Sequence, residues 1–153
     1  MKISKNKIDE FLFVYGTLRK AFDNKILLSV SDNLQYVGIG YLKGVLYDLG
    51  EYPGMVIDKN GELVKGEIYK IDENRNLVFQ LLDEYEGYYK NEKKQSEFLR
   101  KKTTIRLRNG GQIDSWVYSF NYHTKDHLKK ISTGDYIRYL RNDAQNSYKQ
   151  NKS

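Results

Sequence analysis

Short apolar and aromatic runs separated by glycine-containing turns dominate the chain and predict β-strands. Residues 11–15, Phe-Leu-Phe-Val-Tyr, stop at Gly16, as expected of a buried strand. Residues 34–47 are rich in Tyr, Val, Ile and Leu, and their three glycines indicate bulges or bends. Further apolar runs flank Lys59-Asn60-Gly61 and Asn109-Gly110-Gly111, and these turn sequences predict two β-hairpins.

Three segments have helical character. A short one covers residues 25–28, with Asp23 as its expected N-cap, and a longer amphipathic one covers residues 77–85, with Asp72 as N-cap. The third begins after Thr133-Gly134-Asp135. Many short strands with few helices predict an α+β fold, with a small mixed, mainly antiparallel β-barrel and flanking helices.

The length of 153 residues allows one domain with a sizeable core. No linker divides the chain, so we expect a single domain over residues 9–143, with flexible ends at 1–8 and 144–153. Aromatic residues make up 14% of the chain, which argues against disorder. The lack of Cys excludes disulfides and thiolate chemistry. No membrane-length apolar run and no signal core are present, so we expect a cytoplasmic protein.

The net charge of +6 is unevenly divided, with −3 in residues 1–89 and +9 in residues 90–153. Lys and Arg interleave with aromatic residues between 98 and 122, a pattern that can bind nucleic acid. A solvated basic surface over a core of those aromatics explains the same pattern. We favour the second interpretation and expect no specific nucleic-acid partner.

Common metal and nucleotide motifs are absent. His123 and His127 would share a helical face, but two histidines without a carboxylate or Cys are a weak metal motif, and a surface pair is the favoured interpretation. Gly38-Ile39-Gly40 lacks the third glycine and the following helix of a dinucleotide fingerprint. We therefore expect no metal site.

Two segments carry more chemical information. At Tyr15-Gly16-Thr17-Leu18 an apolar strand ends abruptly, and such a break can leave backbone N–H groups free for an anion or a carbonyl oxygen, although a plain strand end has the same pattern. Glu86 ends the amphipathic helix before Gly87, a typical helix-terminating glycine. The helix dipole and the neighbouring acids Asp83 and Glu84 would raise the pKa of Glu86, unless all three acids are simply exposed.

Together these segments resemble the gamma-glutamylcyclotransferase-like family, and in particular its gamma-glutamylamine cyclotransferase branch. The resemblance covers residues 11–141 and rests on the order and spacing of several motifs. These are Tyr15-Gly16-Thr17-Leu18, residues 44–54 with their Leu46-Tyr47 and Tyr52-Pro53-Gly54, Leu82-Asp83-Glu84-Tyr85-Glu86-Gly87, Trp116-Val117-Tyr118 and residues 131–136. The chain departs from the family at Phe98-Leu99-Arg100, where Tyr-any-Arg is frequent, and this difference bears on the leaving group more than on the chemistry.

The resemblance implies cyclisation of a gamma-glutamyl compound to 5-oxoproline, with release of an amine or amino acid and without a cofactor. It implies that Glu86 is the general acid/base and that Tyr15, Gly16, Thr17 and Leu18 bind the substrate. The partner would be a small gamma-glutamyl molecule. A non-catalytic small-molecule-binding module of the same fold is the alternative, because a fold does not fix a function.

Overall fold

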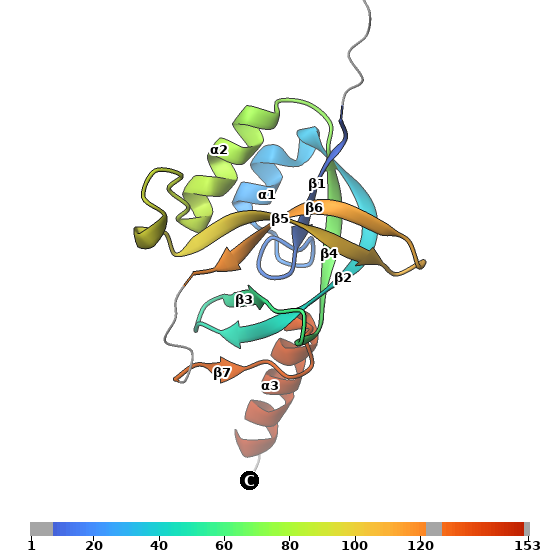
Figure 1. The fold of residues 1–153 in the computed structure, drawn as a ribbon. Coiled ribbons are helices and arrows are strands. Elements are labelled where there is room, and N and C mark those ends of the chain that lie inside the picture. Colours follow the sequence, from blue (N-terminus) through green and yellow to red (C-terminus); the bar gives the residue numbers. More distant parts are fainter. Residues whose placement is uncertain (1–7, 122–126, 152–153) are drawn as a thin grey trace, which may run out of the picture.

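The computed structural model describes residues 8–121 and 127–151 and contains seven β-strands and three α-helices in this part of the chain (Figure 1). The strands are β1 (Glu10–Val14), β2 (Leu34–Asp48), β3 (Pro53–Ile57), β4 (Glu62–Ile71), β5 (Phe98–Leu107), β6 (Gln112–Phe120) and β7 (Lys129–Lys130). The helices are α1 (Lys25–Val30), α2 (Arg75–Glu86) and α3 (Tyr136–Asn151). Two 3-10 turns lie at Ser31–Asn33 and Lys93–Gln95.

Five strands close into a barrel in the order β2-β4-β1-β6-β5, and pairing of β5 with β2 completes the ring. Only the β1–β6 contact in this ring is parallel, through Leu12 and Trp116. The predicted mixed, mainly antiparallel barrel with flanking helices is therefore confirmed. Strands β3 and β7 pair with the outer end of β2, beyond the ring.

Strand β1 is covered on both faces, which explains its uninterrupted apolar sequence. Leu12 and Val14 pack in a cluster with buried residues of α1 and α2, such as Leu82. Phe13 and Tyr15 point to the opposite face and join the cluster inside the barrel. Figure 1 shows α1 and α2 together on one side of the barrel, with α3 at the other end. The strand that leads into the candidate site is thus fixed from both sides.

One of the two predicted hairpins is confirmed and the other is wrong. Strands β5 and β6 pair antiparallel around the turn at residues 108–111. Residues 58–61 also form a tight turn, but β3 and β4 each pair antiparallel with β2, so they run parallel to each other. The two strands do not pair with each other because β2 is long enough to pair with β3 along one part of its length and with β4 along another.

The predicted helices are present, with different N-caps for the first two. Asn24, not Asp23, caps α1, since its Oδ1 accepts from the N–H groups of Ile26 and Leu27 at 2.8 and 3.3 Å. The residue before α2 is Asn74, not Asp72, and its left-handed φ of 53° turns the chain into the helix without a side-chain cap. Helix α3 begins directly after Asp135, as predicted, and the Asp135 carboxylate accepts from the N–H groups of Ile137 and Arg138 in its first turn. This helix continues past residue 143 to Asn151.

Candidate active site

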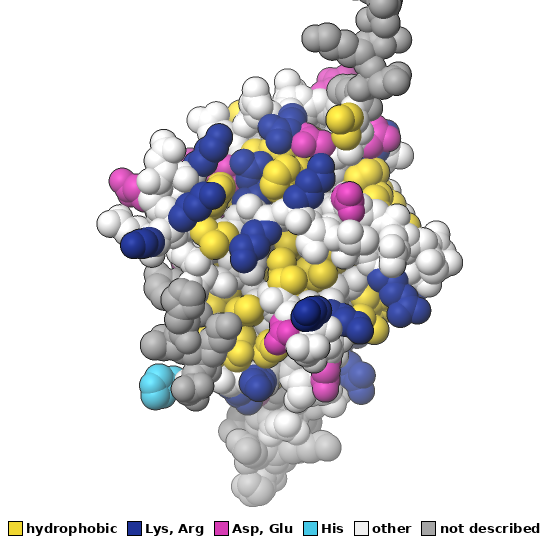
Figure 2. All heavy atoms as spheres, viewed as in Figure 1, with side chains coloured by type: hydrophobic (Ala, Val, Ile, Leu, Met, Phe, Trp, Pro, Cys, Tyr) yellow, Lys and Arg dark blue, Asp and Glu magenta, His cyan; other side chains and the backbone are white. Residues whose placement is uncertain are grey.

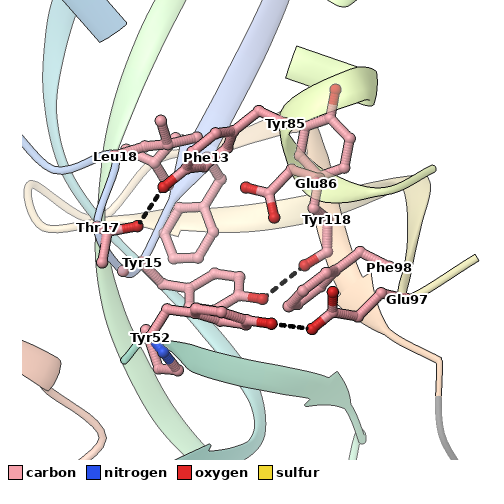
Figure 3. A pocket seen from close by; sticks show the side chains of 13 residues that line it. Phe13, Tyr15, Thr17, Leu18, Tyr52, Tyr85, Glu86, Glu97, Phe98 and Tyr118 are labelled. Carbon is pink, nitrogen blue, oxygen red and sulfur yellow. Dashed lines mark hydrogen bonds between the residues drawn. The ribbon is translucent and has the colours of Figure 1, made fainter. Parts of the chain in front are cut away.

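A cavity of about 200 Å³ opens where the end of β1 meets the end of α2 (Figure 3). The loop after β1 contributes the segment Tyr15–Leu18, and α2 contributes Tyr85 and Glu86. The remaining wall is formed by Phe13, Val14, Tyr52, Pro53, Glu97, Phe98 and Tyr118. This size suits a metabolite rather than a large ligand. All five residues singled out in the sequence thus surround one space, although the chain separates Leu18 from Glu86 widely.

The loop after β1 is held by its side chains and leaves backbone donors free. The Tyr15 hydroxyl donates to the carbonyl of Tyr118 at 2.6 Å and accepts from the N–H of Met55 at 3.1 Å. Burial and the nearby charge of Glu86 raise the pKa of Tyr15, so its hydroxyl remains a donor. Among the described residues, no acceptor pairs with the N–H groups of residues 16–18. These groups can bind a carboxylate or an oxyanion.

A second contact ties the same loop to α2. The hydroxyls of Thr17 and Tyr85 lie 3.0 Å apart, and the Tyr85 hydroxyl also accepts from Asn24 Nδ2 at 3.0 Å. Asn24 caps α1 with its other side-chain atom, so one asparagine connects α1 with α2 and the loop. The relative position of Thr17 and Glu86 is therefore set by hydrogen bonds.

Glu86 lies at the C-terminal end of α2 with its carboxyl directed into the cavity (Figure 3). Gly87 ends the helix in the left-handed conformation, with φ of 66°, and Tyr88 N–H donates to the carbonyl of Asp83 at 2.9 Å. This is the Schellman arrangement that glycine favours. Within the described part of the chain, no hydrogen-bond donor reaches the Glu86 carboxyl. Burial, and then the charge of Glu97, raise the pKa of Glu86 to about 8.

The raised pKa was expected from the sequence, but its cause is different. Asp83 accepts from the Tyr118 hydroxyl at 2.6 Å and lies 3.1 Å from Arg100 Nε, so it is neutralised locally. Glu84 is exposed. The like charge that acts on Glu86 belongs to Glu97 instead, a residue that sequence reasoning missed because it follows a charged stretch typical of a solvated loop.

Glu97 comes immediately before β5, and the fold ties it to the end of α2. Its N–H donates to the carbonyl of Gly87 at 3.1 Å, and its carbonyl accepts from Asn121 N–H at 2.9 Å. The Tyr52 hydroxyl donates to Glu97 Oε1. That hydrogen bond, followed by burial, raises the pKa of Tyr52 to about 12, so Tyr52 is a neutral donor at physiological pH. The cavity therefore holds two carboxyl groups on adjoining backbone segments.

Metal and nucleic-acid interpretations gain no support from the described residues. The described residues include no group of three or more His, Cys, Asp or Glu side chains that could hold a metal ion. His127 is exposed, and His123 and Tyr122 lie outside the described residues. Phe98 and Tyr118 are buried and unavailable for stacking on bases. Figure 2 shows Lys and Arg side chains spread over one face among acidic and apolar ones. No helix of the described chain is both long and apolar enough to cross a membrane.

Comparisons with known proteins identify the family and the fold. The model of the family "Gamma-glutamyl cyclotransferase, AIG2-like" matches residues 12–138. The crystal structure of an AIG2-like protein from Mus musculus is 25% identical with a TM-score of 0.64, over 81% of this chain and 86% of that one. YkqA from Bacillus subtilis is also 25% identical, with a TM-score of 0.66, over 90% of this chain but 43% of that one.

A structure titled gamma-glutamyl cyclotransferase is 10% identical with a TM-score of 0.51, over 80% of this chain and 69% of that one, and shares the fold. A search of curated proteins finds no match. The family match spans the loop after β1, the end of α2 and the barrel strands between them, so the chain belongs to the AIG2-like gamma-glutamyl cyclotransferase family.

Proposed function

We propose that the protein cyclises a gamma-glutamyl compound to 5-oxoproline and releases an amine or amino acid. The observation that carries this proposal is that Glu86 and residues 16–18, whose N–H groups have no acceptor among the described residues, line one cavity. The substrate contains its own nucleophile, because its α-amine can attack its gamma-carbonyl carbon. The reaction therefore needs orientation, proton transfer and stabilisation of an oxyanion, with no protein nucleophile.

Glu86 would move the proton. Its carboxylate accepts a proton as the α-nitrogen forms the new C–N bond, and the resulting acid delivers that proton to the leaving nitrogen as the old C–N bond breaks. A pKa of about 8 serves both steps near neutral pH, because a group with a matched pKa both accepts and releases the proton readily.

The loop after β1 would bind negative charge. Its N–H groups are held in place by the hydrogen bonds of Tyr15 and Thr17, so they need little reorganisation when a carboxylate or oxyanion arrives. Tyr15, Gly16, Thr17 and Leu18 thus act as substrate-binding residues in this proposal. The substitution of a single donor of this kind typically lowers the rate ~10²–10³-fold.

The test is release of 5-oxoproline from a panel of gamma-glutamyl amines and dipeptides. We expect wild-type protein to release it and the Glu86→Gln variant to lose at least ~10²-fold in kcat/KM, the lower end of the usual contribution of one acid/base group. Glu84→Gln is the matched control, because Glu84 is an exposed glutamate on the same helical turn. Full activity of a folded Glu86→Gln variant would refute the role of Glu86. Binding of panel compounds without turnover by wild type would instead identify a binding module.

A further inference from the structure

Two bridges of hydrogen bonds join the loop after β1 to the end of α2, and they differ in burial. The bond between the hydroxyls of Thr17 and Tyr85 is exposed, so water competes with it. The second bridge passes through Tyr118. The Tyr118 carbonyl accepts from the Tyr15 hydroxyl (Figure 3), and the Tyr118 hydroxyl donates to Asp83 Oδ1, both at 2.6 Å. The first of these two bonds is buried and the second partly buried, so this bridge is the stronger constraint.

Asp83 connects this bridge to the part of α2 that carries Glu86. It lies one helical turn before Glu86, and its carbonyl accepts from Tyr88 N–H at 2.9 Å where Gly87 ends the helix. The backbone of Asp83 thus closes the helix, and its side chain holds Tyr118. Burial, followed by the hydrogen bond to Asp83, raises the pKa of Tyr118, so the hydroxyl keeps its proton and remains the donor.

The Asp83 carboxylate is also held by Arg100, which comes from β5. Arg100 Nε lies 3.1 Å from Asp83 Oδ1, and the two side chains are 15% and 22% exposed. The guanidinium lies 4.0 Å from the ring centre of Phe79 and 5.0 Å from that of Trp116. Its Nε and Nη1 atoms are buried and form no well-aligned hydrogen bond with the described residues, so Asp83 and the rings balance its charge. Because a planar group packed on rings has little freedom, Arg100 limits the movement of the carboxylate as well.

These two charged residues lie behind the cavity wall. The described residues that line the cavity include Tyr118 but neither Asp83 nor Arg100. The pair can therefore affect a reaction in the cavity only through the residues that it holds. The proposed reaction requires Glu86 and the N–H groups of residues 16–18 to meet one substrate in a fixed geometry, and a misplacement of about 1 Å can cost roughly 10²-fold in rate.

We propose that Asp83, held by Arg100, is a positioning residue that sets the loop after β1 against the end of α2 through its hydrogen bond with Tyr118. This inference rests on the proposed function. It assigns the ion pair a role in the geometry of the reaction in addition to the stability of the fold.

The test measures kcat and KM for 5-oxoproline release in Tyr118→Phe, Asp83→Asn and the double variant, with the gamma-glutamyl compound that wild type turns over fastest. Tyr118→Phe removes the donor but keeps the ring. We expect its kcat to fall about 10-fold, as the loss of one hydrogen bond can give, with KM nearly unchanged. Asp83→Asn keeps an acceptor oxygen without the charge, so its kcat should fall only about 3-fold. The double variant should lose no more than Tyr118→Phe, because the acceptor has no donor left to hold.

Tyr139→Phe is the matched control. The Tyr139 hydroxyl donates to Asp48 Oδ2 at the same distance of 2.6 Å, but it comes from α3, at the other end of the barrel from α2 (Figure 1). Its kcat should equal that of wild type. An unchanged kcat in folded Tyr118→Phe would overturn the proposal. Losses that multiply in the double variant would also overturn it, since Asp83 would then act independently of Tyr118.

The pH profile separates positioning from an effect on the titration of Glu86. Burial and the charge of Glu97 raise the pKa of Glu86, and neither is removed in these variants. The rising limb of the rate profile should therefore keep its midpoint in Tyr118→Phe and Asp83→Asn, while the plateau falls. A shifted limb with an unchanged plateau would mean that the two residues act on the pKa of Glu86, and the proposal would be overturned.

Hydrogen exchange distinguishes a failure of this inference from a failure of the proposed function, because it needs no turnover. If wild type releases 5-oxoproline from no compound, the proposed function fails, but exchange in peptides that cover residues 12–19 and 83–88 still tests the bridge. Tyr118→Phe should accelerate exchange in both segments, and Tyr139→Phe should leave them at the wild-type rate. Wild-type exchange of both segments in Tyr118→Phe would overturn the inference.

Discussion

Arg19 and Glu67 form a buried ion pair directly behind the loop that lines the cavity. Arg19 Nε lies 3.2 Å from Glu67 Oε2, and the two side chains are 5% and 3% exposed. Glu67 Oε1 accepts from Lys20 N–H at 2.9 Å, and Arg19 also contacts Asp135 at 2.8 Å. One carboxylate on β4 therefore fixes the residues that follow the substrate-binding loop, and it connects them to the cap of α3.

Replacement of Glu67 by Ala should destabilise the fold strongly. The substitution would leave Arg19 with Asp135 alone and remove the acceptor of Lys20, and breaking a buried pair in this way costs about 3–5 kcal/mol. Urea unfolding followed by circular dichroism measures the change. Glu62→Ala, at an exposed position on the same strand, is the control and should remain within about 0.5 kcal/mol of wild type. A similarly small loss for Glu67→Ala would show that the pair does not secure the loop.

The pH dependence of catalysis should report the titration of Glu86. Because its ionised form accepts the proton, kcat/KM should rise with pH and level off above the pKa of about 8. The charge of Glu97 contributes to that raised pKa, so Glu97→Gln should shift the rising limb to lower pH. Rate profiles from pH 5.5 to 9.5, with a substrate whose own titration is measured separately, test this. A limb that stays in place in the variant would contradict the coupling.

The same carboxyl should make stability depend on pH. The folded-state pKa of about 8 exceeds the ordinary pKa of 4.5 for a glutamate, so the folded protein binds more protons between these values and wild-type stability falls as pH rises through this range. Glu86→Gln does not ionise, and its unfolding free energy relative to wild type should increase by about 2–4 kcal/mol from pH 5 to pH 9. Denaturant titrations at both pH values measure this difference. Equal differences would mean that the carboxyl titrates normally.

The sequence predicted the barrel because its strands are marked locally, by apolar runs and glycine-containing turns. It did not predict which strands pair across the turn at residues 58–61, because an Asn-Gly turn does not reveal that the long strand β2 takes both neighbours. The caps of α1 and α2 were misplaced by one or two residues for a similar reason. Asp and Asn are both preferred N-cap residues, so residue type does not decide between Asp23 and Asn24. Only the backbone geometry shows that Asn24 is the cap.

The residues of the candidate site also fall into two groups, those that the sequence predicted and one that it did not. Glu86 and the loop after β1 carry sequence motifs, so they could be named in advance. Glu97 carries none, since it follows the stretch Lys90–Gln95 and looks like part of a solvated surface. Its place beside Glu86 depends on backbone hydrogen bonds to Gly87 and Asn121, and its orientation depends on Tyr52. These contacts join segments that come together only in the folded barrel, so the sequence alone does not predict them.

Gly16 is predicted to matter for catalysis because of its contact with Pro53. A Cβ atom at Gly16 would lie 2.7 Å from Pro53 Cγ, too close to be accommodated without movement. Since both residues line the cavity, Gly16→Ala should displace the free N–H groups and lower kcat/KM for 5-oxoproline release by about 10- to 100-fold.

The Pro53→Ala substitution removes the atom that would clash, so the double variant should regain much of the lost activity. A double-mutant cycle on kcat/KM measures this coupling, with Tm values recorded for all four proteins. Additive losses in the double variant would show that Gly16 acts through something other than its contact with Pro53.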